Sequence, residues 1–286
     1  MINYKTEIDT IALQIDCKDV KEQQYSLDII RRCIVPSRIA SIKFNNQNKK
    51  HEVYYGNTVL ATIKTGFSYS SYYIRIRFAG LKRYNDVIDH KSKLCLMLLC
   101  GWLKSTGILF RLVELDIAID IFCPFYNILV ACTRKTPHVA YNDVGHTQYY
   151  DGVPTSYIEA INSRRASKVA TSRSYLYNKS SKEGLNVNVT RFELKLQNKY
   201  FKSFGFNAQS IIDALSKYHV MYFSNLTQKR YIINKLNSYQ SVHRREINRL
   251  GLEGYRLYPN AKVIKQFIYD LNSVYIDFNG NIALHP

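Results

Sequence analysis

The sequence lacks the features that mark secreted, thiolate-metal and membrane-spanning chains. Its six cysteines form no C-x-x-C pair, and the N-terminus shows no secretory leader pattern. The longest apolar run, Leu94 to Leu103, is about half of the roughly 20 residues that cross a bilayer. We therefore expect buried, reduced thiols in a cytoplasmic protein that makes no membrane contact.

Acidic residues are also scarce. The chain carries 22 Asp and Glu against 40 Lys and Arg, which gives a formal charge of +18 and a pI near 9.5. At 286 residues with 46% hydrophobic side chains, it can bury a core without disulfides. The excess positive charge favours a polyanionic partner, and nucleic acid is the leading candidate.

The pattern of elements predicts an α+β fold: a mainly antiparallel sheet core with flanking helices and a helical C-terminal region. Alternating strand patterns dominate the first two thirds, with a hairpin turn at Gly56-Asn57. Pro124 is suited to the first turn of a helix over 125–135, and a longer basic helix is expected over 228–250. The predicted domains are 1–203, a catalytic core, and 204–286, a helical DNA-binding or support region.

An acidic strand is the first candidate site. In the run LDIAID, side-chain alternation places Asp116, Ala118 and Asp120 on one face of the strand. One interpretation is a polar face that meets solvent or pairs with an arginine from a neighbouring strand. The other is a hard-cation site, because Mg²⁺ and Mn²⁺ take oxygen ligands from carboxylates, water and phosphate.

The run TRFELKLQ offers a matching strand. Arg191, Glu193 and Lys195 share one face, opposite an apolar face. If this strand lies near the first, Glu193 joins Asp116 and Asp120 at a metal while the two cations hold phosphate. The alternative is a surface strand whose exposed ion pairs contribute little stability.

Basic residues gather between Glu159 and Glu183, a stretch without any acid. Such a stretch is either a solvated loop or a surface that binds a phosphodiester backbone, and the overall charge favours binding. The predicted helix over 228–250 adds Arg244 and Arg245, either as DNA contacts or as a solvated face. The basic residues of the acid-free stretch are Arg164, Arg165, Lys168, Arg173, Lys179 and Lys182.

Two tyrosines lie within this basic stretch. In SYLYNK, the residues Tyr175, Tyr177 and Lys179 share a strand face. A tyrosine attacks a phosphodiester as a phenolate, but its ordinary pKa of about 10 means that it needs a metal or a nearby cation. Lys179 is the predicted activating cation, and the alternative is that these are ordinary strand tyrosines.

The order of these motifs resembles the trans-acting replication initiation factor family of rolling-circle plasmids and filamentous phages. That family reads R-(hydrophobic)-D-(hydrophobic)-A-x-D, a T-x-Y-x-G-S-like turn, R-x-Y-D/E-K and R-(hydrophobic)-E. The corresponding segments here are 114–120, 147–152, 175–179 and 191–193. The similarity spans roughly residues 90 to 200.

The resemblance implies a nicking and joining enzyme. A tyrosine cleaves one origin strand, stays attached to the 5′-phosphate and leaves a 3′-hydroxyl that primes replication. By motif position, Tyr177 is the nucleophile, with Tyr175 as the second choice, and a divalent metal is held by Asp116, Asp120 and Glu193. The resemblance also implies a homodimer in a bacterial host cell, with host helicase and polymerase as partners.

The sequence departs from the family at several points. Glu114 stands in place of the usual arginine, Asn178 replaces an acid, and about 24 residues separate Gly152 from Tyr177. No His-hydrophobic-His motif occurs, so a carboxylate site is the expected metal centre. The alternative function is a non-catalytic, sequence-specific DNA-binding protein on the same fold. An RNA-binding module ranks last, because the glycine-aromatic signatures of RNA-binding folds are missing.

Overall fold

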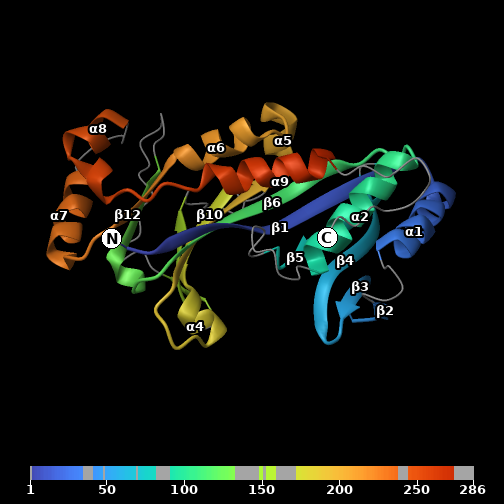
Figure 1. Ribbon diagram of the computed structural model, residues 1–286, viewed down its shortest axis with the longest axis horizontal. Helices are drawn as coiled ribbons and strands as arrows, with labels where there is room; N and C mark the ends of the chain where they lie inside the picture. The colour runs from blue at the N-terminus through green and yellow to red at the C-terminus, as the bar shows by residue number, and fades with distance from the viewer. Residues whose placement is uncertain are drawn as a thin grey trace. The chain divides into compact units, whose positions relative to one another are not determined.

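The computed structural model (Figure 1) confirms the predicted α+β class with a large antiparallel sheet. Ten strands follow the order β2-β3-β4-β5-β1-β6-β11-β10-β9-β8, and β12 and β7 form a second sheet. The pairs β1–β5, β2–β3, β3–β4, β4–β5, β8–β9, β9–β10, β10–β11 and β7–β12 are all antiparallel. The structure describes residues 2–34, 41–47, 49–68, 70–81, 91–132, 148–150, 153–158, 172–237 and 244–273.

The strands are β1 (Tyr4–Cys17), β2 (Ser41–Asn45), β3 (Lys50–Tyr55), β4 (Thr58–Ser68), β5 (Ser71–Ala79), β6 (Arg111–Ile121), β7 (Ile128–Cys132), β8 (Gln148–Tyr150), β9 (Val153–Ile158), β10 (Ser172–Asn178), β11 (Thr190–Gln197) and β12 (Tyr218–Tyr222). The α-helices are α1 (Val20–Ile34), α2 (Lys91–Ser105), α4 (Lys179–Glu183), α5 (Asn198–Phe204), α6 (Ala208–Ser216), α7 (Leu226–Asn237), α8 (Arg244–Arg249) and α9 (Ala261–Ser273). Two short 3₁₀ helices are η1 (Phe125–Asn127) and η2 (Leu252–Tyr255).

The chain divides into two compact units. Unit 1 contains Met1–Glu7 and Ile117–Ala261, and unit 2 contains Ile8–Asp116 and Lys262–Pro286. The strands β1 and β6 contribute residues to both units. This division differs from the predicted boundary at residue 203, because each unit is built from segments far apart in the sequence.

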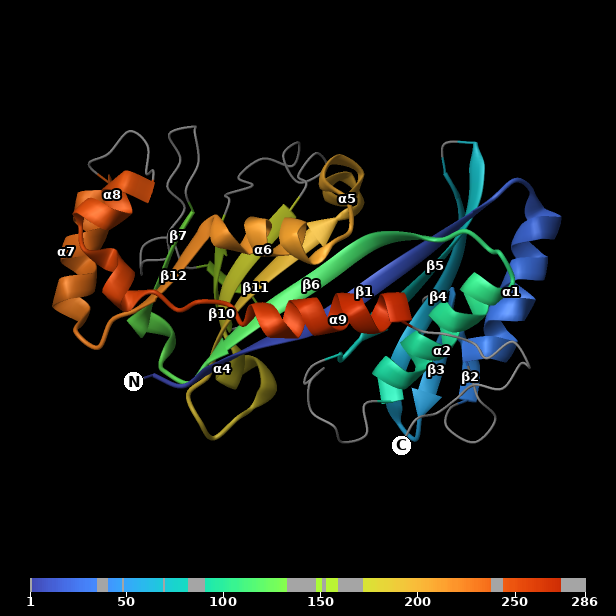
Figure 2. The same ribbon diagram turned by 45° about the horizontal axis from the view of Figure 1, so that its top comes forward.

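Unit 2 is a sheet with one apolar and one polar face. Ile74, Ile76 and Phe78 of β5 are fully buried, and α1 and α2 lie side by side over β4 and β5 (Figure 2). Alternate residues of β5 point to the other face, as expected for an antiparallel sheet covered on one side. The predicted hairpin between β3 and β4 is confirmed: Gly56 has a φ of 55°, a left-handed conformation that glycine adopts without strain.

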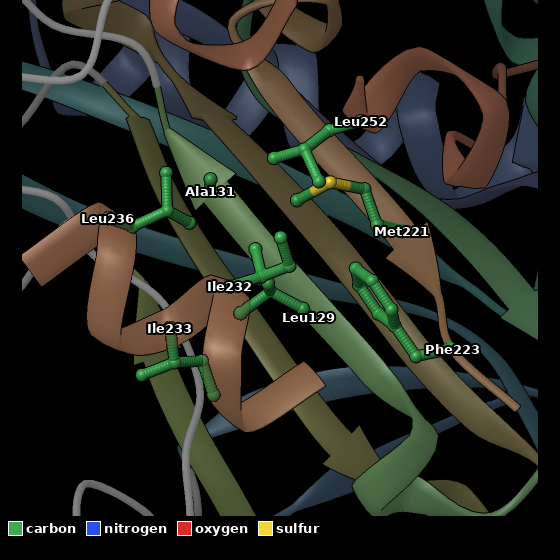
Figure 3. Packing of buried hydrophobic residues seen from close by; sticks show 8 residues of the cluster. All are labelled: Leu129, Ala131, Met221, Phe223, Ile232, Ile233, Leu236 and Leu252. Carbon is green, nitrogen blue, oxygen red and sulfur yellow. The ribbon is translucent and has the colours of Figure 1, made fainter. Parts of the chain in front are cut away.

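Unit 1 combines the strands β9, β10 and β11 with the smaller β12-β7 sheet. Helix α7 packs Ile232, Ile233 and Leu236 onto that smaller sheet, where they meet residues such as Leu129 and Met221 (Figure 3). These side chains are at most 5% exposed, so α7 is held by its apolar face. The opposite face of α7 includes the exposed Arg230, Tyr231 and Lys235.

Two predicted helices differ from the structure. Over 125–132, the described part of the predicted helix 125–135, the chain makes the turn η1 and then enters β7, because Ile128 and Val130 are β-branched and Val130 pairs with Val220 of β12. Over 228–250 the described residues form two helices, α7 and α8, where one was predicted. Within the described part of the chain, no helix is long and apolar enough to span a bilayer.

The cysteines that the structure describes agree with the predicted buried thiols. Five of them are buried and free of disulfides: Cys17, Cys33, Cys95, Cys100 and Cys123. Burial raises the pKa of Cys100 to about 12 and that of Cys123 to about 11, so both remain protonated near neutral pH. These thiols are therefore packed core groups.

A candidate tyrosine site in unit 1

The pairing of β10 with β11 assembles the candidate site. Tyr177 lies directly opposite Arg191, and Tyr175 lies opposite Glu193. Residues directly opposite each other in an antiparallel pair share a face of the sheet, so these four side chains stand on one face. The alternation predicted for β11 is confirmed, because Phe192, Leu194 and Leu196 on its other face are all buried.

Tyr177 is held by a carboxylate and a cation. Its hydroxyl donates to Oε2 of Glu193 at 3.2 Å, and Nζ of Lys182 lies 4.5 Å from the centre of its ring. Tyr177 is only 7% exposed. An ammonium group at this distance over an aromatic ring is attracted to the ring's negative face.

The short helix α4 brings Lys182 back over the end of β10. The side chain of Asn178 accepts a hydrogen bond from the backbone N–H of Ser181 at 3.0 Å and so caps the first turn. Gly184 ends the helix in the left-handed conformation, with φ at 63°. After β10 the chain therefore makes one capped helical turn that positions the lysine.

A buried charge network lies on the neighbouring strands. Asp120 of β6 accepts two hydrogen bonds from Arg191, at 2.6 and 2.8 Å, and one from Lys179, at 2.5 Å. Arg191 also donates to Glu7 of β1 at 3.0 Å. Arg191 and Asp120 are each 1% exposed, which makes this a fully desolvated network.

The network fixes the ionisation state of Asp120. Burial by itself raises the pKa of this carboxyl group, but the hydrogen bonds and charges of Arg191 and Lys179 outweigh burial and hold its pKa below the usual value. Asp120 is therefore an anion at neutral pH. Both of its oxygens already accept hydrogen bonds from cations.

This arrangement does not fit the predicted three-carboxylate metal site. In the described residues no group of three His, Cys, Asp or Glu side chains is placed to hold a metal ion. Asp120 is occupied by Arg191 and Lys179, and Asp116 belongs to unit 2, where Oδ2 lies 3.8 Å from the guanidinium of Arg77. The alternative interpretation of the acidic strand, pairing with arginine, is the one observed. Glu193 alone fits a smaller site, since Mg²⁺ is often bound by one or two carboxylates together with phosphate and water.

Two predicted roles change in consequence. Lys179 was expected to activate Tyr177, but its ammonium group binds Asp120, and the cation over the Tyr177 ring is Lys182. Arg191 was expected to contact DNA, but a side chain with 1% exposure in a buried ion pair does not reach a phosphate at the surface. Both corrections have the same cause, which is the burial of Asp120.

The remaining predicted DNA contacts fall into three groups. Arg164, Arg165 and Lys168 lie outside the described residues. The backbones of Arg173 and Arg244 are described in β10 and α8, but their side chains are not. Lys182 and Arg245 are exposed, and Lys195 is half-buried on β11.

Sequence reasoning missed Glu7 and the contact of Lys182 with the tyrosine ring. Glu7 and Arg191 are 184 positions apart, and no local pattern links them. For Lys182 a signal was present, because a tight turn after a strand returns the chain over that strand's end. The four residues between Tyr177 and Lys182 span such a turn.

No protein-family model matches the chain, and no curated protein matches it closely. Among solved structures, the chain is similar to a rolling circle replication initiator protein from Geobacillus stearothermophilus. The sequences are 13% identical, the TM-score is 0.43, and the match covers 89% of this chain and 98% of the other. At this identity and TM-score, the likeness does not establish an activity for this chain.

Proposed function

We propose that the protein is a rolling-circle DNA replication initiator that nicks and rejoins one origin strand through a covalent bond to Tyr177. The observation that carries the proposal is the Tyr177 hydroxyl on the Glu193 carboxylate with the Lys182 ammonium above its ring. The +18 charge and the motif order of the initiator family agree with it. Tyr175, on the same face and opposite Glu193, is the second choice of nucleophile.

In the proposed reaction, the Tyr177 oxygen attacks phosphorus and the bond from phosphorus to the 3′ oxygen breaks. The tyrosine proton passes to Glu193, and the departing 3′ oxygen takes up a proton to become the primer hydroxyl. The strand's 5′-phosphate stays on Tyr177 as a phosphodiester. Joining is the reverse, with a 3′-hydroxyl as the attacking group, so no oxidant or nucleotide cofactor is consumed.

Glu193 alone is too weak a base for this step. An ordinary phenol has a pKa of about 10 and an ordinary glutamic acid about 4.3, a gap of roughly 8 kcal/mol at 1.36 kcal/mol per unit. The hydrogen bond therefore holds the resting tyrosine in its protonated form. Lys182 contributes in the right direction, because a cation near the ring stabilises a phenolate more than a phenol.

The remaining activation is proposed to need a divalent cation, Mg²⁺ or Mn²⁺. Such an ion, when bound, neutralises charge on the scissile phosphate and lowers the barrier to attack. Glu193 is the carboxylate of unit 1 that we propose as its protein ligand, with Asp120 remaining on Arg191 and Lys179. Arg191 and Lys179 act as positioning residues, since they fix the strands that carry Tyr177 and Glu193.

One observation favours the alternative, a non-catalytic DNA-binding protein on the same fold. Asp120, the last acid of the family motif, is neutralised by two buried cations. A protein that only binds DNA has no need of a free carboxylate there. Covalent adduct formation separates the two functions.

The test is to incubate the full chain with single-stranded oligonucleotides from its own replicon, with Mn²⁺ or with EDTA, and to detect covalent adducts by their mass on denaturing gels. Adducts should form only with the metal and should vanish in Tyr177→Phe. Tyr54→Phe is the matched control, because Tyr54 also donates to a glutamate, Glu52, at 2.6 Å. Loss of the adduct only in Tyr175→Phe would identify Tyr175 as the nucleophile. Tight DNA binding without any adduct would establish the non-catalytic alternative.

A further inference from the structure

The polar face of the unit 2 sheet is not used by the tyrosine site. Across β2 to β5, side chains of this face include six residues that we call the open face: Lys43, Lys50, Lys64, Tyr73, Arg75 and Arg77. The opposite face of the same strands is apolar and is covered by α1 and α2. Lys43, Lys64 and Arg75 are exposed to solvent.

Two cations of the open face are direct neighbours. Lys64 of β4 lies opposite Arg75 of β5, and both are exposed. Like charges directly opposite each other in a sheet are destabilising, so this pair costs stability in the free protein. A bound anion removes that repulsion, and the pairing is therefore an independent sign of an anionic partner.

The acidic residues of this face are engaged within it. Glu52 accepts hydrogen bonds from Tyr54, at 2.6 Å, and from Asn45, and it pairs with Lys50 at 2.9 Å. These partners, Tyr54 foremost, lower the pKa of Glu52 to about 2. The carboxylate is thus turned inward to its neighbours, while Lys64 and Arg75 remain at the surface.

Arg77 is likewise held in place. It lies opposite the small side chain of Ala12 on β1, and its guanidinium reaches past that residue to Glu114 on β6 at 2.9 Å. Its side chain is still 40% exposed. Two aromatic rings lie on this face, those of Tyr54 and Tyr73. The Tyr73 side chain lies over Gly66, where an added Cβ would come within 2.5 Å of the tyrosine oxygen.

We infer that the open face of unit 2 binds the backbone of single-stranded DNA. Cations presented on a flat sheet together with aromatic rings suit a single strand, whose phosphates are neutralised while unpaired bases meet the rings. This inference deepens the proposed function, because a nicked origin exposes single-stranded DNA. It assigns to unit 2 a role in holding the strand, separate from the tyrosine chemistry of unit 1.

The test measures binding without cleavage. Both variants are made in the full chain that carries Tyr177→Phe. The open-face variant adds Lys64→Gln and Arg75→Gln. The α1 control adds Lys18→Gln and Lys21→Gln, which remove two exposed charges at the start of α1 instead. Binding of fluorescein-labelled oligo(dT) of about 20 nucleotides is followed by anisotropy over a range of salt. Because each phosphate contact on a single strand contributes about 0.7 to the slope of log K against log salt, the open-face variant should lose about 1.4 in slope.

At about 0.05 M salt the same variant should bind roughly tenfold or more weakly than the α1 control. Its melting temperature should stay close to that of the control, because the loss of the repulsive pair offsets the loss of the hydrogen bond that Arg75 donates to Gln14. Equal affinities and equal slopes for the two double variants would overturn the inference. Stronger binding of a duplex of the same length would overturn the assignment to single strands.

The two proposals fail separately. If no protein forms a covalent adduct but the open-face variant still loses affinity, the nicking function is wrong and the DNA-binding face stands. Adduct formation is compared in chains that keep Tyr177, with and without Lys64→Gln and Arg75→Gln. If both form adducts at saturating oligonucleotide, and the open-face variant binds as tightly as the α1 control, the nicking function stands and the open face is wrong.

Discussion

The two units contain the same trio of residue types in different settings. In unit 1, Tyr177 donates to Glu193 at 3.2 Å under Lys182, and in unit 2, Tyr54 donates to Glu52 at 2.6 Å with Lys43 5.6 Å from its ring. A tyrosine, a glutamate and a lysine in contact therefore do not define a catalytic site by themselves. The surroundings of each glutamate make the difference.

Glu52 is bound by three neighbours, whose hydrogen bonds lower its pKa to about 2, and Tyr54 has a raised pKa because it donates to that stable anion. In this pair Glu52 therefore stays an anion and Tyr54 keeps its proton. In unit 1 the two buried cations, Arg191 and Lys179, are bound to Asp120 instead. The chain thus places its fixed ion pairs beside Tyr177 and leaves the tyrosine bonded to a separate carboxylate.

The largest effect is expected from Asp120→Asn. The change removes the buried carboxylate that Arg191 and Lys179 share and leaves Arg191 only Glu7, and breaking a buried pair in this way costs about 3–5 kcal/mol. Urea denaturation should show this loss in the free energy of unfolding. Glu114→Gln, which breaks the more exposed pair with Arg77, should cost less than about 1 kcal/mol. Equal losses of unfolding free energy in Asp120→Asn and Glu114→Gln would mean that burial does not make the Asp120 pair more important for stability.

Glu193→Gln should slow adduct formation by about 10²-fold, the usual contribution of a positioned acid–base group, or more. The amide still accepts the Tyr177 hydrogen bond but takes up no proton. The rate is measured in a single turnover at saturating oligonucleotide, with Mn²⁺ titrated to detect weaker metal binding. Glu52→Gln in unit 2 is the control and should leave this rate unchanged, whereas an equal fall in both variants would argue for a general loss of structure.

Lys182→Gln should reduce the same rate by about tenfold, since an ammonium over an aromatic ring is worth about 1 kcal/mol or slightly more. Lys182→Arg keeps the charge and should restore most of the activity. Rescue by arginine at unchanged oligonucleotide affinity points to the ring contact. A change confined to affinity would instead identify Lys182 as a phosphate contact only.

The smallest effect concerns His51 of unit 2. Burial first, and then the charge of Arg31 with its guanidinium 3.0 Å away, lower the pKa of His51 below its usual value. The unfolded chain therefore binds more protons than the folded one just below the ordinary histidine pKa of about 6.5, and stability should fall as the pH drops through that range. Thermal melting of wild type and His51→Gln between about pH 7.5 and 5.5 checks this, and a parallel pH dependence in both proteins would exclude His51 as the cause.

Local pattern predicted much of the sheet correctly. Period-two alternation placed Phe192, Leu194 and Leu196 on the buried face of β11, and Gly56-Asn57 marked a real hairpin. Where prediction was wrong, a distant partner intervened. The segment after Pro124 becomes β7 because β12, about 90 residues later, pairs with it.

The sequence predicted part of the candidate site. Alternation put Tyr175, Tyr177, Arg191 and Glu193 on two polar strand faces, and the register of β10 on β11 then joined those faces. Alternation along β6 also predicted a shared face for Asp116 and Asp120. It could not indicate that this face is buried, because burial depends on which strands lie beside β6.

The sequence by itself determined the strongly basic charge, the strand alternation and the motif order that resembles replication initiators, since these are properties of neighbouring residues. Only the tertiary structure decided that Asp120 is held by Arg191 and Lys179 and that Lys182 is the cation over Tyr177. It also placed Lys64 beside Arg75 on an open sheet face. The reason is physical: charge partners are chosen by strand pairing and desolvation, and both act between segments that the chain keeps far apart.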